Sequence, residues 1–156
     1  MYPSPESLTE FLTKAHHSTY ADERAKKAEM LRPSSHNYHF EEEDFAYHDT
    51  YFGGKKFIGE EVVYWKGKPV WGMNYYGTTV DETLAESFVD SILRPALMET
   101  PWSDLPVRGP KHFEREGFEY VMQIREGNMT SFSAEERIVK NGALLFRNFL
   151  HGGWIE

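Results

Sequence analysis

Two stretches of the sequence alternate apolar and polar residues with a period of two, and this alternation limits the fold more than any other feature. They span residues 35–77 and 112–152, and short segments of turn-forming residues divide each of them. Strands that bury one face have this pattern, and each stretch has room for three or four strands. The sequence therefore predicts two β-meanders, which are antiparallel because their turns are short.

The two stretches also resemble each other. From Phe57 onward, positions match those 75 residues later in the chain. The matching pairs are Phe57 with Phe132, Glu60 with Glu135, Glu61 with Glu136, Gly67 with Gly142, Trp71 with Phe146 and Gly77 with Gly152. A preceding strand matches at an offset of 73, with Tyr47 on Tyr120. This order predicts an internal duplication with a pseudo-two-fold axis, although two unrelated hairpins of alternating pattern could also align.

Apolar residues at helical spacing occur ahead of each meander. A serine, a proline and a glutamate form a typical helix start and predict a helix over residues 5–17. Thr79 and Glu82 resemble a capping box and predict a second helix over residues 80–98. The polar segment 18–34 is compatible with a frayed helix or a surface loop, and we favour the loop.

These elements predict a single domain over residues 1–156. The expected fold class is α+β, with a mainly antiparallel sheet built from two similar meanders in the order α-β(3–4)-α-β(3–4). The helices are expected to pack on one face of that sheet. A groove along the axis between the two halves would be a natural place for a ligand.

Composition narrows the classes of function. The absence of cysteine removes disulfides, thiolate metal sites and thiol nucleophiles. A net charge of −8 repels phosphate backbones, so direct nucleic-acid binding is not expected. The amino-terminal segment does not resemble a signal peptide and no long apolar segment follows, so we expect a cytoplasmic protein outside the membrane.

Aromatic residues are concentrated in residues 57–77 and include Trp71, Tyr75 and Tyr76. The first interpretation is that these rings form the interior of the sheet, with their polar atoms bonded locally. The second is that they line a pocket for a small molecule, with Asn74 supplying a polar contact.

Glu61 and Glu136 occupy matching positions and could converge near the axis. Like charges would then raise the pKa of one carboxyl and permit acid–base catalysis of a hydrolase or isomerase type. Alternatively, each glutamate lies at a strand end in water or bonds a nearby Lys or Arg. His151 takes the place of Tyr76 in the second stretch, so both rings could frame one pocket.

The other motifs carry less information. The seven histidines lack the spacing of a metal site, so we expect neither a metal ion nor another cofactor. Arg108 and Lys111 offer an anion contact, but the Pro-rich connector around them is more typical of solvated surface.

Four segments identify a resemblance to a known family: "FLTKAHHSTYA", "DFAYHDTYFGGKKFIGEEVVYWKGKPVWGMNYYG", "RGPKHFEREGFEY" and "FLHGGWI". Over nearly the whole chain the sequence resembles the bacterial family catalogued as domain of unknown function 5680. Members of that family often follow a helix-turn-helix DNA-binding domain of the XRE type, so the resemblance implies a module in the position of a regulator's sensor. No room for such a domain precedes the first strand, so we expect the free-standing form. The resemblance implies no activity.

Three functions stay open. The favoured one is a module that binds or senses a small molecule through Glu61, Trp71, Asn74, Tyr75, Tyr76, Glu136 and His151. The second is an enzyme that uses the glutamate pair with a histidine such as His151. The third is a protein-interaction module, for which a flat exposed aromatic face would argue, and a homodimer is one form it could take.

Overall fold

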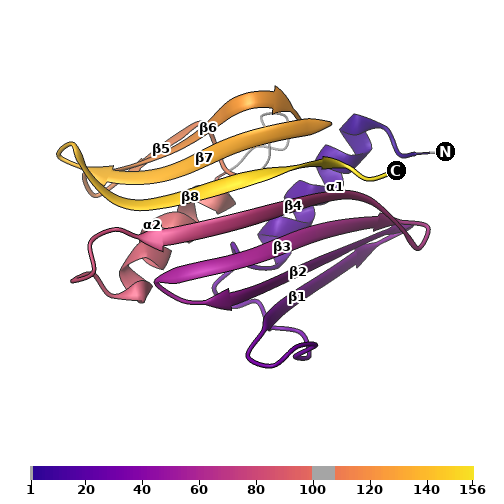
Figure 1. The fold of residues 1–156 in the computed structure, drawn as a ribbon, viewed down its shortest axis with the longest axis horizontal. Helices are drawn as coiled ribbons and strands as arrows, with labels where there is room; N and C mark the ends of the chain where they lie inside the picture. The colour runs from indigo at the N-terminus through magenta and orange to yellow at the C-terminus, as the bar shows by residue number, and fades with distance from the viewer. Residues whose placement is uncertain (1, 100–107) are drawn as a thin grey trace.

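One antiparallel sheet of eight strands dominates the protein, in the order β1-β2-β3-β4-β8-β7-β6-β5 (Figure 1). The computed structural model describes residues 2–99 and 108–156. The elements are α1 (Pro5–Ser18), β1 (His36–Glu42), β2 (Phe45–Gly53), β3 (Lys56–Trp65), β4 (Lys68–Thr79), α2 (Glu86–Met98), β5 (His112–Arg115), β6 (Phe118–Asn128), β7 (Ser131–Lys140) and β8 (Ala143–Trp154). The α+β class with a mainly antiparallel sheet is therefore confirmed.

The two meanders lie side by side and meet along β4 and β8. These strands pair antiparallel, with Tyr75 opposite Leu150 near the middle of the ladder. The bounds of β3 and β7, and those of β4 and β8, differ by 75 positions. Both hairpins turn through two residues with positive φ, Lys66–Gly67 and Asn141–Gly142. Such turns require a residue that tolerates positive φ, and glycine adopts it without a steric penalty.

Both helices cover the same face of the sheet (Figure 1). α1 begins where the sequence predicts, since the hydroxyl of Ser4 accepts a hydrogen bond from the amide of Ser7 at 3.2 Å. The second helix begins at Glu86 and not at residue 80, so the expected capping box is wrong. Thr79 is the last residue of β4, where it pairs with Phe146 of β8. The strand continues to Thr79 because β8 supplies a pairing partner that far.

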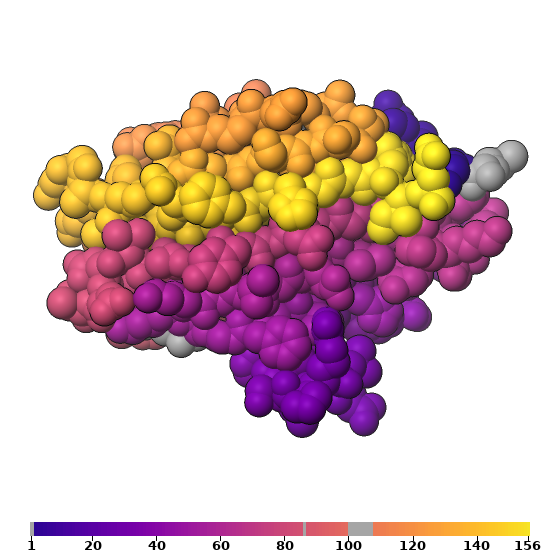
Figure 2. Space-filling model, in the orientation of Figure 1, coloured from indigo at the N-terminus to yellow at the C-terminus, as the bar shows by residue number. Residues whose placement is uncertain are grey.

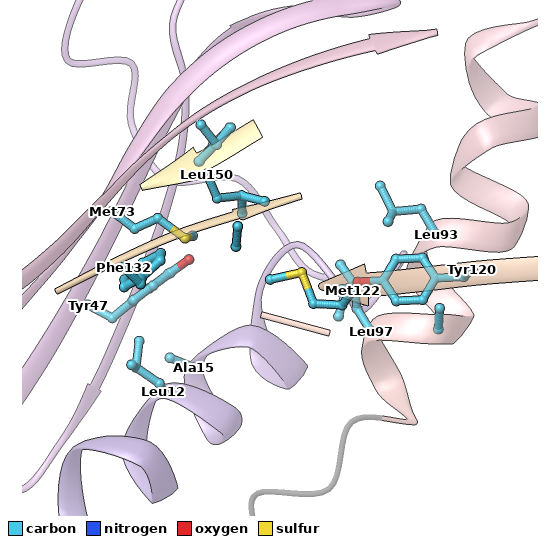
Figure 3. Packing of buried hydrophobic residues seen from close by; sticks show 14 of the residues in the cluster. Leu12, Ala15, Tyr47, Met73, Leu93, Leu97, Tyr120, Met122, Phe132 and Leu150 are labelled. Atoms are coloured by element: carbon cyan, nitrogen blue, oxygen red, sulfur yellow. The ribbon is translucent and has the colours of Figure 1, made fainter. Parts of the chain in front are cut away.

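The core lies between the sheet and the two helices. α1 packs against β1 and β2, whereas α2 packs against β5 and β6. Figure 3 shows Leu12 and Ala15 of α1 beneath Tyr47, and Leu93 and Leu97 of α2 beside Tyr120 and Met122. The chain from residue 19 to 35 forms a loop without helix or strand. Within the described ranges, no helix is both long and apolar enough to cross a bilayer.

The opposite face of the sheet carries no helix, and Figure 2 shows it from the front. We call it the outer face, and the helix-covered face the inner face. Residues on each strand alternate between the two faces. Three exposed apolar side chains, Ile58, Tyr76 and Phe149, lie in one row across β3, β4 and β8.

Candidate functional site

The sequence-predicted site residues divide between the two faces of the sheet. Glu61, Trp71, Tyr75 and Glu136 are buried on the inner face, with at most 4% of each residue exposed. Asn74, Tyr76 and His151 are exposed on the outer face. Neighbouring residues in a strand point to opposite faces, so the two sets cannot line one pocket. The structure therefore brings together only the first four residues.

Trp71 belongs to the core. It is fully buried, its indole N–H donates to the carbonyl of Met129 at 3.0 Å, and its ring stacks on Phe132 with centroids 6.0 Å apart. This is the local bonding that the interior interpretation requires.

Glu61 forms a carboxyl pair with Asp49, a residue that sequence reasoning missed. Asp49 lies directly opposite Glu61 in the register of β2 and β3. Nε2 of His16 from α1 lies 2.7 Å from Oε2 of Glu61. The hydroxyl of Tyr75 donates to Oδ1 of Asp49 at 2.6 Å. All four side chains are nearly inaccessible to solvent, so the cluster is a buried polar network.

The two carboxyls of this pair have opposite pKa shifts. Burial, and then the charge of Glu61, raise the pKa of Asp49 to about 8, against the hydrogen bond from Tyr75 and the charge of Arg108. Burial also disfavours the charged form of Glu61, but His16 and Arg108 hold the pKa of Glu61 below its ordinary value. The pair therefore holds one proton at neutral pH, on Asp49. Asp49 is then a neutral carboxylic acid.

Glu136 lies in a second buried network on the inner face of β7. Oε1 accepts a hydrogen bond from the hydroxyl of Tyr120 at 2.7 Å, and Oε2 accepts one from the amide of Asn148 at 2.8 Å. Nε of Arg108 lies 3.4 Å from Oε1. The predicted pairing of Glu61 with Glu136 thus takes a different form, because each glutamate has its own hydrogen-bond partners and the carboxyl opposite Glu61 is that of Asp49.

Arg108 connects the two networks. Only 5% of the residue is exposed, and its guanidinium lies 5.2 Å from the ring centre of Tyr20 and 5.5 Å from that of Tyr75. Although burial opposes it, the charges of Glu136 and Glu61 raise the pKa of Arg108 above its ordinary value. The interpretation of Arg108 as solvated surface was therefore wrong. Its local sequence gives no indication of burial, but two glutamates on the buried face of the sheet favour a buried cation near them.

A cavity of about 160 Å³ lies beside Asp49 and Tyr75. Residues of the sheet, of α2 and of the loop after α1 line it. Five rings contribute to its walls: Tyr20, Tyr51, Phe57, Tyr75 and Phe146. Five charged or ionisable groups also face it: Lys27, Asp49, Asp90, Arg94 and Arg108. The cavity thus combines an aromatic wall with a few polar groups, which is typical of small-molecule sites.

Gly59 allows Tyr75 to reach Asp49. Gly59 pairs with Tyr75 across β3 and β4, and a Cβ at Gly59 would lie 2.4 Å from the hydroxyl oxygen of Tyr75. A side chain there would displace the phenol from the position in which it donates to Asp49. The glycine therefore helps to shape the polar end of the cavity.

A metal site has no candidate ligand set in the described part of the chain. Among residues 2–99 and 108–156, no three His, Cys, Asp or Glu side chains converge in a way that could hold an ion. The imidazole of His16 is engaged by Glu61, and His151 lies on the other face of the sheet.

Comparisons with known proteins give a family and nothing more specific. No curated protein and no solved structure matches the chain significantly. A family described as domain of unknown function (DUF5680) matches residues 49–155, which include both meanders from the middle of β2 to the end of β8. Because this match covers more than half of the sequence, the chain belongs to the DUF5680 family.

Proposed function

We propose that the protein is a small-molecule-binding module whose ligand occupies the cavity beside Asp49 and Tyr75. One observation carries the proposal: a buried arginine, Arg108, and a buried carboxyl, Asp49, both line a partly open cavity with aromatic walls. Charged groups are rarely buried without a structural partner or a ligand to orient. Arg108 has a structural partner in Glu136, yet it also lines the cavity.

The dimensions of the cavity indicate a ligand with one ring. Its volume of about 160 Å³ is close to that of an engineered cavity of about 150 Å³ that binds benzene. The aromatic wall supports a flat, apolar body by burial of its surface. Larger ligands with several rings would require α2 or the loop after α1 to move.

The charges around the cavity favour an anionic or strongly hydrogen-bond-accepting group on that ligand. Lys27, Arg94 and Arg108 provide three cations, and among the described residues of the lining Asp90 is the one other acid besides Asp49. The Tyr75 hydroxyl donates its hydrogen bond to Oδ1 of Asp49. The other carboxyl oxygen of the neutral acid can therefore donate its proton to a ligand oxygen. We therefore infer a ring with a carboxylate or a carbonyl oxygen directed at Asp49 and Arg108.

Calorimetric titration and thermal-shift measurements with single-ring acids test this proposal. Benzoate and phenylacetate serve as probes, with benzyl alcohol as the uncharged comparison. Binding should raise the melting temperature in a concentration-dependent way, and the acids should bind more tightly than the alcohol. If no single-ring acid binds, the proposal fails.

A variant that fills the cavity separates binding from folding. Val89 of α2 lines the cavity, and Val89→Phe should weaken binding at least ten-fold, since a phenyl group would occupy about the volume of the ligand. Asn74→Ala, on the outer face of β4, is the matched control and should leave binding unchanged. Equal binding by Val89→Phe and the parent protein would contradict the assignment.

Catalysis in the same cavity is the second candidate, and the neutral acid Asp49 favours it. A carboxyl with its pKa near 8 can both donate and accept a proton at neutral pH. In this form the acid is Asp49, assisted by Tyr75, and not the pair of Glu61 and Glu136 with His151. Asp49→Asn should then abolish turnover of a bound substrate while the affinity for it changes little.

We also infer that the two meanders derive from one duplicated unit. The constant spacing of the strand bounds and the antiparallel pairing of β4 with β8 support this inference. An experimental structure in which Lys56–Thr79 superposes closely on Ser131–Trp154 would strengthen it, and unlike backbones would exclude it.

A further inference from the structure

Three arginines converge on one glutamate on the outer face of β6, β7 and β8. Glu135 is 4% exposed, and it forms an ion pair with Arg125 and another with Arg147, whose Nε lies 2.9 Å from Oε1. Nε of Arg137 lies 4.0 Å from the same oxygen. We call these four residues the arginine cluster. Its formal charge is +2, on a chain whose net charge is −8.

Strand register and an irregularity in β6 bring the members of the arginine cluster together. Arg137 and Arg147 lie directly opposite each other in the register of β7 and β8, an arrangement that destabilises a sheet when nothing separates the like charges. Arg125 is the extra residue of an irregularity in β6, between Ile124 and Glu126. Bulges of this kind redirect a side chain, and here Arg125 reaches Glu135.

One carboxylate does not satisfy the three guanidinium groups. In the described part of the chain, the buried Nε–H groups of Arg137 and Arg147 have no aligned hydrogen-bond acceptor, and Oε1 of Glu135, 2.9 Å from Nε of Arg147, has no aligned donor. The neighbouring acid Glu119 instead lies 3.3 Å from His112. Buried donors without an acceptor destabilise a protein, so an additional anion at this position would be stabilising.

An apolar surface adjoins the arginine cluster. Phe149 lies directly opposite Glu135 on β8, and Tyr76 lies opposite Phe149 on β4. Both rings are about half exposed. The guanidinium of Arg147 lies 5.5 Å from the ring centre of Phe149. A ligand held by the arginines would therefore have a flat surface beside it on which a ring can pack.

We propose that this part of the outer face binds a small aromatic phosphomonoester, with the phosphoryl group on the arginine cluster and the ring over Phe149 and Tyr76. Arginine forks match phosphate oxygens in pairs of parallel hydrogen bonds. A phosphomonoester carries a charge of about −1.5 to −2 at neutral pH, which balances the +2 of the cluster. The site lies on the opposite face of the sheet from the cavity and does not depend on the function proposed for the cavity.

Phenyl phosphate is the probe, and amide chemical shifts from NMR locate its binding. Saturable shifts should occur in β7 and β8 around Glu135 and Phe149. Inorganic phosphate should bind at the same place about two- to ten-fold more weakly, because it lacks the ring that stacks on Phe149. The absence of saturable shifts in these strands would overturn the proposal.

Variants of Arg147, whose side chain is partly exposed, and of Arg115 test the contacts. Arg147→Gln should weaken binding at least ten-fold, and Arg147→Lys should weaken it less, since lysine keeps the charge but loses the paired hydrogen bonds. Arg115→Gln removes the same charge from an exposed position on β5 and should change the affinity less than two-fold. If Arg115→Gln and Arg147→Gln had equal effects, the attraction would be general, and the site would be excluded.

Two further variants separate the contact with the ring from the contact with the phosphoryl group, and this site from the cavity. Phe149→Ala should weaken phenyl phosphate but leave inorganic phosphate unchanged, and Val89→Phe in the cavity should alter neither. A phosphotyrosine peptide should bind no more tightly than phenyl phosphate. A peptide that binds at least ten-fold more tightly would overturn the assignment to a small molecule, because a protein would then be the better ligand.

Discussion

Glu61 and Glu136 occupy matching places on β3 and β7, but their surroundings give them different roles. Each is buried on the inner face with a tyrosine beside it, Tyr47 for Glu61 and Tyr120 for Glu136. Glu136 is held by Tyr120, Asn148 and Arg108 within the core. Glu61 instead contacts His16 of α1, and it lies opposite Asp49, whose carboxyl faces the cavity.

Much of this difference comes from two pairs of matching positions that carry different residues in the two meanders. The position that matches Asp49 is Met122, and the position that matches Met73 is Asn148. In the second meander the polar partner is thus an uncharged amide that hydrogen-bonds Glu136. In the first meander the polar partner is the carboxyl of Asp49, which lies opposite Glu61. The charge of Glu61 disfavours a second negative charge on Asp49. One arrangement stabilises the fold, and the other creates a carboxyl group with a raised pKa.

Removing the two glutamates in turn should give the largest effects and the clearest contrast. Glu136→Ala should lower the free energy of unfolding by about 3–5 kcal/mol, because Arg108 stays charged and loses its nearest carboxylate. Glu61→Ala should cost about 1–3 kcal/mol, since its partner His16 is an imidazole and not a guanidinium with a permanent charge. Urea denaturation measures both. A larger loss for Glu61→Ala would mean that the first network is the structural one.

The stability of the protein should respond to pH through Asp49. Because its folded-state pKa is raised from 3.8 to about 8, the folded protein keeps a proton that the unfolded chain has lost. The contribution of Asp49 to stability is thus greatest at low pH, falls as the pH rises from about 4 to about 8, and stays low above that. The charges that determine this behaviour are Glu61 and Arg108, with Tyr75 as the hydrogen-bond donor.

Asp49→Asn isolates this effect. The variant should gain stability relative to the parent protein by about 2 kcal/mol between pH 6 and pH 8, because asparagine does not titrate. Denaturation curves at several pH values measure the gain, and Met122→Leu at the matching position serves as the control without a pH-dependent difference. A parallel pH dependence in the parent protein and Asp49→Asn would show that Asp49 ionises normally.

Tyr75→Phe should have a smaller effect, again on Asp49. The variant loses the hydrogen bond to Oδ1 and should cost about 1 kcal/mol of unfolding free energy. Since that hydrogen bond lowers the pKa of Asp49, its loss should move the pKa further upward. The carboxyl carbon of Asp49, followed by NMR as a function of pH, reports the change. A downward shift would contradict the assigned role of the phenol.

The strand pattern was sufficient to predict the fold class and the faces of single strands. The period of two already separates Trp71 and Tyr75 from Asn74 and Tyr76, and grouping all four in one site ignored that separation. The burial of Asp49 could also have been predicted from the sequence, because Asp49 shares a strand face with Tyr47 and Tyr51.

The contacts that complete the site depend on long-range geometry. His16 reaches Glu61 across 45 positions of sequence, and Arg108 reaches both networks from a connector whose composition is typical of surface. The opposition of Asp49 and Glu61 depends on the register of β2 and β3, which strand periodicity alone does not determine. The start of α2 was misplaced for a similar reason, since pairing of β4 with β8 outweighs a local capping motif at Thr79.

The smallest effects are expected on the outer face, where Asn74 and His151 form a directly opposed pair of β4 and β8. Both are exposed, so Asn74→Ala and His151→Ala should each change the unfolding free energy by less than about 0.5 kcal/mol. Neither side chain can contact a ligand in the cavity, because the backbone of the sheet lies between them and Asp49. Calorimetric titration of each variant with a single-ring acid measures this independence. If Asn74→Ala weakened that binding as Val89→Phe should, the two faces would be coupled, and the cavity would not act as a separate site.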